Sequence, residues 1–176
     1  MALSGESPAE RIEWTIARTL FGPMLLAASG KGVCRLAFEE DGTELASHFP
    51  QARLQPGGAE VSRLAELVAI VLDDPGKALK IPLDLRGTPF QLAVWRQLCR
   101  IPAGETRSYA AIAEAIGHPR AVRAVGSANA ANPVAVLVPC HRVVRSDGAL
   151  GGYAYGERLK RMLLRREGAL RESVPA

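Results

Sequence analysis

The hydrophobic residues of the first part of the chain fall into short runs separated by glycine. Residues 11–40 read RIEWTIARTLFGPMLLAASGKGVCRLAFEE, and the runs rich in Ile, Leu, Val and Phe are interrupted at FGP and SGKG. Apolar runs of this length with Gly-centred breaks are typical of strands joined by tight turns. The pattern therefore predicts a meander of two or three antiparallel strands.

Helical spacing replaces this pattern farther along the first half. In segment 59–74 the apolar residues recur every three or four positions, as they do on one face of a helix. These residues are Val61, Leu64, Leu67, Val68 and Val71. The segment DGTELASHF before it predicts a shorter helix ending near an exposed His48, with PGGA separating the two. KIPLDLRG then indicates a short extended segment before a boundary near Arg86.

Helices dominate the second half, and their ends are marked by capping residues. TPFQLAVWRQLCRI begins with Thr88 as a candidate N-cap, Pro89 in the first helical position and Gln91 three residues after the cap. This order is the capping-box pattern. A short helix in SYAAIAEAIG is expected to be capped by Ser108 and stopped by Gly117.

The next helix is expected to run from Pro119 to Ala130, and with the helix before it would form a helix-turn-helix. Arg120 and Arg123 lie three residues apart, so they would share one side of it. Ala124 and Ser127 are among the small residues that would let its backbone approach another surface closely. The same small residues also suit simple helix packing, with both arginines solvated.

Together the elements predict an α+β protein. A small three-stranded antiparallel sheet with helices would occupy residues 1–85, a mainly helical domain residues 86–170, and a flexible tail residues 171–176. A chain of 176 residues is long enough for a core of its own, as one domain or as two small ones.

Composition and charge narrow the class of protein. With 48% apolar and 23% charged residues the chain resembles folded globular proteins. It has no apolar run of the roughly 18 residues that cross a bilayer, and MALSGESPAER carries acids where a signal peptide would be basic and then apolar. These features predict a cytoplasmic protein that does not enter membranes.

The positive charge is concentrated in the second half. Residues 1–86 hold 9 Lys and Arg against 12 Asp and Glu, whereas residues 87–176 hold 13 against 6. Lys and Arg supply most of the sequence-independent affinity of proteins for nucleic acids, although basic surfaces are often only solvated. The split favours nucleic-acid contact by the second half.

The three cysteines lie 65 and 41 residues apart, which fits neither a disulfide framework nor a metal-binding pair. Cys34 and Cys99 are expected to be small buried hydrophobes. Cys140 differs, because in VLVPCHRVV it follows the β-prone run PVAVLV and precedes His141. It is expected at the end of a buried strand, with His141 pointing to the other side.

A cysteine nucleophile has to be a thiolate, so it needs a base nearby. His141 would reach Cys140 through a water or through a turn fastened by Asn132 or Pro139. His141 in turn needs an acid, and Glu167 at the end of the last helix opposes the helix dipole, which favours a specific role over a solvated one. A neighbouring Cys-His pair is weak evidence alone, so catalysis stays one of several readings at this point.

Several segments together resemble the O6-alkylguanine-DNA alkyltransferases, most closely the C-terminal half of bacterial Ada. They are IPLDLRGTPFQ, VWRQL, IPAGETRSYAAIA, AVRAVGSANAAN, VPCHRVVRSDGALGGY and LLRREG, spread over about residues 82 to 168. The most specific signal is PCHRV with an upstream Asn-Pro and a downstream GGY. The resemblance implies an RNase H-like first half and a winged helix-turn-helix-like second half.

The resemblance also implies site residues. Cys140 would accept the alkyl group, His141 and Glu167 would activate it through a water, Asn132 would brace the turn, and Tyr109 would donate a proton toward N3 of guanine. Helix 119–130 would lie in the DNA minor groove, with Arg123 filling the space of the flipped base. Further DNA contacts would come from Arg120, Ala124 and Ser127, and the base pocket from Ala135, Val143, Tyr153 and Ala154.

The implied reaction is a single irreversible transfer from O6-alkylguanine, and less so from O4-alkylthymine, in duplex DNA. It would need no cofactor and no metal, and the protein would be a monomer in the bacterial cytoplasm. Ala135 stands where some relatives have proline, which would widen the pocket. Ala154 stands where some have serine, so only its backbone N–H could contact O6.

Two other functions remain possible. A cysteine hydrolase would use Cys140, His141 and Glu167 with turnover and would not need the basic half. A non-catalytic module would only bind alkylated DNA, although the cysteine in PCHRV argues against it. Uptake of an alkyl group by the protein separates these functions.

Overall fold

The computed structural model describes residues 9–77 and 79–170, so the predicted tail at 171–176 lies outside the described residues. The chain begins with a meander of β1 (Arg11–Thr19), β2 (Gly22–Ser29) and β3 (Gly32–Phe38). Two-residue turns join them, and Gly22 and Gly32 have φ of 107° and 144°, which favour glycine. The predicted meander is confirmed.

The sheet has a fourth strand that the sequence pattern does not predict. β4 (Arg53–Pro56) pairs in parallel with β1, so the order is β3-β2-β1-β4 and the sheet is mixed rather than purely antiparallel. RLQP is four residues long, ends in proline and lacks an alternating apolar pattern. Its pairing depends on the tertiary position of β1, which explains why local pattern misses it.

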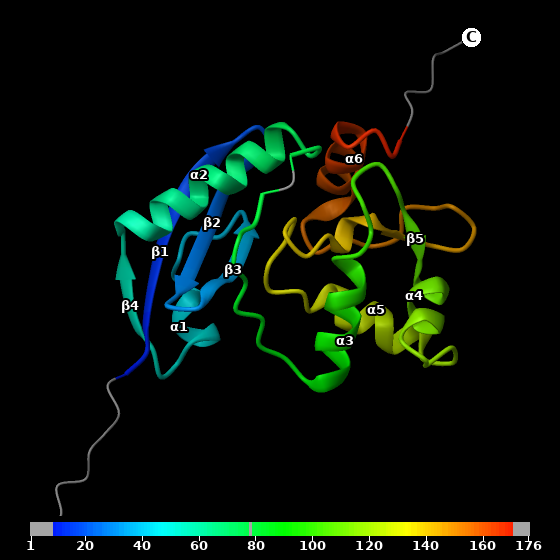
Figure 1. The fold of residues 1–176 in the computed structure, drawn as a ribbon, viewed down its shortest axis with the longest axis horizontal. Coiled ribbons are helices and arrows are strands. Elements are labelled where there is room, and N and C mark those ends of the chain that lie inside the picture. Colours follow the sequence, from blue (N-terminus) through cyan, green and yellow to red (C-terminus); the bar gives the residue numbers. More distant parts are fainter. Residues whose placement is uncertain (1–8, 78, 171–176) are drawn as a thin grey trace, which may run out of the picture.

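Two helices accompany the sheet. The short α1 (Leu45–His48) ends at an exposed His48, as expected. α2 (Ala59–Asp73) lies across one face of the sheet (Figure 1). Its buried residues are Val61, Leu64, Ala65, Val68 and Leu72. Leu67 and Val71 are half-buried, so they lie at the margin of the predicted face.

The second half lies beside the β3 edge of the sheet and is mainly helical (Figure 1). α3 (Pro89–Leu98) begins with the predicted capping box, in which Thr88 and Gln91 each accept a hydrogen bond from the other's backbone N–H. α4 (Tyr109–Ala115) is capped by Ser108, and Gly117 after it has a φ of 77°. β5 (Arg107–Ser108) pairs with β6 (Val143–Val144), and α6 (Gly156–Arg166) closes the described second half.

The helix predicted from Pro119 begins later. α5 spans Val122–Ala130 with Ala121 as its N-cap, and residues 118–121 form a turn in which Ala121 N–H donates to the His118 carbonyl at 2.8 Å. Arg120 therefore precedes the helix, and the prediction that it shares a helix side with Arg123 is wrong. Pro119 suits the turn as well as a first helical position, because its fixed φ fits both.

The strand predicted over PVAVLV is also wrong. β3 pairs with the start of this run, since Leu36 N–H donates to the Pro133 carbonyl and Ala135 N–H to the Leu36 carbonyl, both at 3.0 Å. The chain then turns back at Val136, whose φ is 69°, and Val138 N–H donates to the Val134 carbonyl. The apolar character of the run reflects the burial of Val134, Ala135, Val136 and Val138, which a turn in the core shares with a strand.

One hydrophobic core connects the sheet with the second half. A single cluster of buried residues includes Leu26, Val33 and Leu36 of the sheet, Val68 of α2, Trp95 of α3, and Val134, Val138 and Cys140. A smaller cluster around Ile12, Leu25, Cys34 and Phe49 packs on the other face. No helix in the described ranges is long and apolar enough to span a bilayer.

Candidate active site

Cys140 starts a single 3₁₀ turn, Cys140–Arg142, directly after the folded-back run. Its side chain is buried in the second half, with the residue 5% exposed. Cys34 is buried as predicted, whereas Cys99 at the end of α3 is exposed, contrary to prediction. Among the three thiols, Cys140 combines burial with polar neighbours that can act on sulfur.

Asn132 holds both the turn and the sulfur. Its Nδ2 lies 3.0 Å from the Cys140 Sγ and donates to the Val138 carbonyl at 2.7 Å, while its Oδ1 accepts from Val134 N–H at 3.0 Å. Of the two residues predicted to hold this turn, Asn132 and Pro139, Asn132 makes side-chain hydrogen bonds to it. An N–H directed at sulfur favours the thiolate over the thiol.

His141 points away from solvent and toward Glu167. Its Nε2 lies 2.8 Å from Glu167 Oε1, and the two side chains are 0% and 5% exposed. Arg142 donates two hydrogen bonds to the same carboxylate, from Nε to Oε2 at 2.9 Å and from Nη2 to Oε1 at 2.8 Å. The sequence argument gave Arg142 no role, although its place directly after the Cys-His pair was a usable signal.

Burial and neighbouring charges determine which groups of this cluster carry a proton. Burial opposes ionisation of Glu167, but hydrogen bonds from His141 and Arg142 outweigh it and bring its pKa to about 2. A carboxylate only accepts, so the hydrogen of the His141–Glu167 bond belongs to Nε2. Burial also lowers the pKa of His141, against the pull of Glu167, and the ring is therefore neutral. Its Nδ1 has no partner among the described residues and carries the free lone pair.

Burial raises the pKa of Cys140, and the bond from Asn132 and the charge of Lys160 act against it. Lys160 is completely buried in α6 and donates to the carbonyls of Val143, Leu150 and Gly152. Burial lowers its pKa to about 8. Three carbonyl acceptors match the three donors of an ammonium, which favours the charged form near neutral pH. Lys160 was missed, although Leu163 and Leu164 on its helical face indicated burial.

A second missed residue is Asn129, which is 5% exposed and lies on α5. Its Nδ2 donates to the Cys140 carbonyl at 3.3 Å, and Trp95 Nε1 donates to the neighbouring Ala128 carbonyl at 2.8 Å. Both bonds connect α5 to the core near the nucleophile. An Asn on a helix face shared with Val125 and Ala128 was the available signal.

Two of the residues predicted for the base pocket, Tyr153 and Ala154, lie on the loop after β6, and the predicted proton donor Tyr109 lies close to the same loop. Tyr109 begins α4, and a Cβ at Gly151 would lie 3.5 Å from its hydroxyl, so the loop passes close to its ring. The Tyr153 hydroxyl is buried without a partner among the described residues, and burial and nearby Cys140 hold its pKa well above the usual range. Its ring centroid is 6.5 Å from that of His141.

The other predicted pocket residues differ in exposure. Val143 and Ala135 are completely buried, and Ala154 is exposed. Because Ala135 N–H bonds to β3, proline at this position would remove a hydrogen bond as well as fill space. The proposed effect of Ala135 on pocket width is therefore better tested with a larger residue that keeps the N–H.

Three of the predicted DNA contacts share the outer face of α5. Arg123, Ala124 and Ser127 are exposed there, and Ser127 Oγ donates to the Arg123 carbonyl at 3.2 Å. Arg120 is exposed in the preceding turn. The structure thus brings these residues to the surface next to the helix that Asn129 connects to Cys140.

A cluster of metal-type ligands occurs in the first half. The ligand atoms of Glu40, Glu44 and His48 lie within 4.8 Å of one another. Arg35 already donates two hydrogen bonds to Glu40, so one of the three ligands is paired within the protein. It gives no reason to assign a metal.

Comparison with known proteins identifies the family. Residues 89–169 match the family model described as 6-O-methylguanine DNA methyltransferase, DNA binding domain. The methylated-DNA–protein-cysteine methyltransferase of Methanosarcina barkeri is 42% identical over 156 residues, which cover 88% of this chain and 96% of that protein. The chain belongs to the methylated-DNA–protein-cysteine methyltransferase family.

Two further relatives of this family are informative. The Escherichia coli protein named bifunctional transcriptional activator/DNA repair enzyme Ada is 44% identical over 167 residues, 93% of this chain, which spans about half (47%) of that relative's length. The structure of Mycobacterium tuberculosis OGT in complex with DNA matches with a TM-score of 0.79 and 38% identity, covering 89% of this chain and 93% of that one. The predicted α+β fold class is confirmed by this match.

Proposed function

We propose that this protein repairs alkylated DNA by moving the alkyl group from O6 of guanine to Cys140. One observation carries the proposal: the buried Cys140 sulfur lies 3.0 Å from Asn132 Nδ2, and the next residue, His141, is hydrogen-bonded to Glu167. A lone thiol with a directed N–H donor and an adjacent oriented base is the arrangement of an activated cysteine. The family membership supports the same reaction.

His141 serves as the base for Cys140. Glu167 fixes the Nε2–H tautomer and stabilises the imidazolium that forms, and the free Nδ1 accepts the thiol proton through a water. Asn132 and Lys160 stabilise the resulting thiolate. The same groups would serve a hydrolase, so the nature of the substrate separates the two functions.

The transfer is an in-line displacement at carbon. The thiolate forms a sulfur–carbon bond while the bond between this carbon and guanine O6 breaks, and guanine leaves with a proton donated toward N3 by Tyr109. The thiol proton taken by His141 restores Tyr109, so protons and charge balance. Water does not cleave the thioether, and each molecule therefore reacts once, without cofactor or metal.

DNA is bound through α5. A target base inside a duplex is out of reach, so it has to leave the stack at a cost of a few kcal/mol. We propose that α5 lies in the minor groove, Arg123 fills the vacated space, and Arg120, Ala124 and Ser127 contact the strand. Tyr153, Val143, Ala135 and the backbone of Ala154 then line the base pocket, with O4-alkylthymine as a poorer substrate and a monomer as the active form.

The test is intact mass after incubation with a duplex containing O6-methylguanine. We expect the gain of one methyl group per protein, located on Cys140 by peptide mapping, and no gain for Cys140→Ala, which keeps its DNA affinity. Turnover on esters or peptides without a mass gain would point to a hydrolase. If the protein binds the duplex but shows neither a mass gain nor turnover, it is a non-catalytic binding module.

A further inference from the structure

A contact between the two halves lies directly beside the His141–Glu167 pair. Arg166, the last residue of α6, donates from Nε at 3.0 Å and from Nη2 at 2.5 Å to the carbonyl of Asp73, the last residue of α2. Carbonyls in the last turn of a helix lack partners within the helix and carry its negative end. A guanidinium with two donors therefore joins the ends of the two helices.

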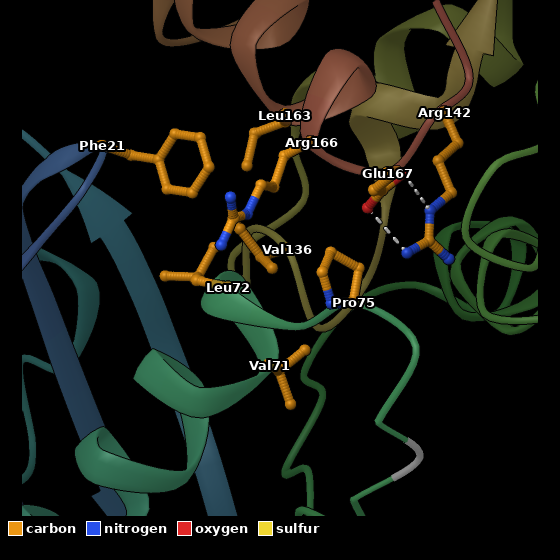
Figure 2. A pocket seen from close by; sticks show the side chains of 9 residues that line it. All are labelled: Phe21, Val71, Leu72, Pro75, Val136, Arg142, Leu163, Arg166 and Glu167. Carbon is orange, nitrogen blue, oxygen red and sulfur yellow. Dashed lines mark hydrogen bonds and ion pairs between the residues drawn. The ribbon is translucent and has the colours of Figure 1, made fainter.

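The seam around this contact is narrow, with Arg166 and Asp73 at its exposed rim. Figure 2 shows the residues lining a small cavity there, with Arg166 extending toward the end of α2 and Glu167 turned toward Arg142. The first half supplies Phe21, Val71, Leu72 and Pro75, and the second half supplies Val136, Arg142, Leu163, Arg166 and Glu167. The cavity measures about 10 Å³, about the least that holds one water molecule, so its inner end has little room for water.

Glu167 follows Arg166 directly in the chain and lines the same cavity. Its side chain is only 5% exposed. Glu167 is the C-cap of α6, where helices readily fray. Without Arg166 the end of α6 would lose its bond to α2, and water would compete with His141 for the carboxylate.

We infer that Arg166 is a positioning residue through which α2 of the first half holds Glu167 against His141. The ion pair of Arg166 with the Asp73 carboxylate, at 4.0 Å and with side chains 47% and 65% exposed, adds little. The two hydrogen bonds from Arg166 to the Asp73 carbonyl are what fix the end of α6 relative to α2. This inference rests on the proposed role of His141 and Glu167 in activating Cys140.

The experiment follows the rate of benzyl transfer from free O6-benzylguanine to Cys140 by intact mass, between pH 6 and 9. Arg166→Ala is compared with Arg165→Ala, which removes the same charge from the neighbouring exposed position. We expect Arg166→Ala to slow transfer about threefold to tenfold near pH 7 and to shift the rise of the rate to higher pH. Arg165→Ala should leave both unchanged.

A double-mutant cycle tests whether the effect passes through Glu167. In the Glu167→Gln background, Arg166→Ala should cause no further loss. The other charged or titratable groups around the pair and Cys140 are the same in every variant; they are Tyr109, Cys140, Arg142, Tyr153, Tyr155 and Lys160. Arg166→Lys keeps one donor and should retain part of the rate, and it replaces Arg166→Ala should the latter not fold.

Equal rates and pH profiles for Arg166→Ala and Arg165→Ala overturn the inference, as does an undiminished effect of Arg166→Ala in the Glu167→Gln background. The proposed function fails separately. If the unaltered protein takes up no benzyl group, the proposed transfer reaction is refuted. If it takes up benzyl normally and Arg166→Ala reacts at the same rate, only the proposed role of Arg166 is refuted.

Discussion

Asn132 bonds to three groups of the turn that presents Cys140, and all of them are buried. Replacing Asn132 by alanine leaves the buried Val134 N–H without a partner, at about 1–3 kcal/mol, whereas the Val138 carbonyl keeps its bond from the Cys140 N–H at 2.8 Å. For a chain of 176 residues we expect Asn132→Ala to lower the melting temperature by roughly 2–4 °C for each kcal/mol lost. It should also slow alkyl transfer, because the sulfur loses its N–H donor.

Asn129→Ala is the matched control. Asn129 bonds to the Cys140 carbonyl but not to the sulfur. It should therefore cost stability while changing the pH dependence of transfer much less than Asn132→Ala does. Calorimetry and the rate of benzyl uptake between pH 6 and 9 measure both effects, and equal pH profiles for the two variants would contradict the role given to Asn132.

Glu167 connects the site to stability in acid. Its pKa is about 2 in the folded chain against an ordinary value of 4.5. A carboxyl with a depressed pKa contributes stability that is fully present above pH 4.5 and is lost as the pH falls toward 2. The shift is equivalent to on the order of 3 kcal/mol.

Glu167→Gln should therefore unfold at lower denaturant concentration at pH 7, and its stability should fall less steeply between pH 5 and pH 2 than that of the unaltered protein. Glu157→Gln, on the same helix but in an exposed pair with Arg161, should change stability by only a few tenths of a kcal/mol. Urea unfolding at several pH values measures these curves. Parallel curves for the unaltered protein and Glu167→Gln would exclude the shift.

At the residue scale, sequence identified the groups whose chemistry is local to a motif. The structure brings Cys140, His141, Glu167 and Asn132 into one cluster. It also adds Asn129, Arg142 and Lys160, for which the sequence offered signals of burial or position but not the bonding partners. Their partners are main-chain carbonyls and a carboxylate far along the chain, and such contacts exist only after the fold has formed.

At the scale of elements, α5 carries the proposed DNA contact. Arg120→Ala and Arg123→Ala each remove one positive charge, so both should weaken DNA binding similarly through the phosphates. Only Arg123 is proposed to fill the space of the flipped base. At saturating duplex, Arg123→Ala should slow transfer from O6-methylguanine about tenfold to hundredfold, because extrusion costs a few kcal/mol.

The matching measurement is transfer from free O6-benzylguanine, which needs no base flipping. There both variants should react at the rate of the unaltered protein. Single-turnover mass measurements give all these rates. Should Arg120→Ala slow the duplex reaction as strongly as Arg123→Ala, charge alone would explain the effect and Arg123 would have no special place.

Elements with strong caps or turns were predicted within a few residues. Thr88 and Ser108 mark the starts of α3 and α4, and the turn before Gly22 separates β1 from β2. The errors at β4 and at 133–138 share a cause, because each segment takes its conformation from a distant strand, β1 and β3 respectively. The late start of α5 has a local cause, the turn at residues 118–121 directly before it.

At the scale of the whole molecule, the division at residues 85 and 86 follows charge and sequence more closely than packing. The largest core cluster contains side chains of the sheet, α2 and the Cys140 turn, without interruption. The free edge of β3 supplies two hydrogen bonds to Pro133 and Ala135, which lie at the base of that turn. The two parts are therefore proposed as units of function that share one core.

This shared core predicts that the second half does not work alone. A chain of residues 86–176 would expose the surface that packs on β2, β3 and α2, would leave the edge bonds of residues 133–135 unmade, and would lose the Arg166–Asp73 contact. We expect it to show helical circular dichroism without a cooperative melting transition, to bind ANS, and to take up benzyl from O6-benzylguanine at least tenfold more slowly than the intact chain. Cys140, His141 and Glu167 are all present in that piece, so a cooperative transition together with uptake at the full rate would mean that the second half holds the catalytic geometry by itself and that the first half has no part in it.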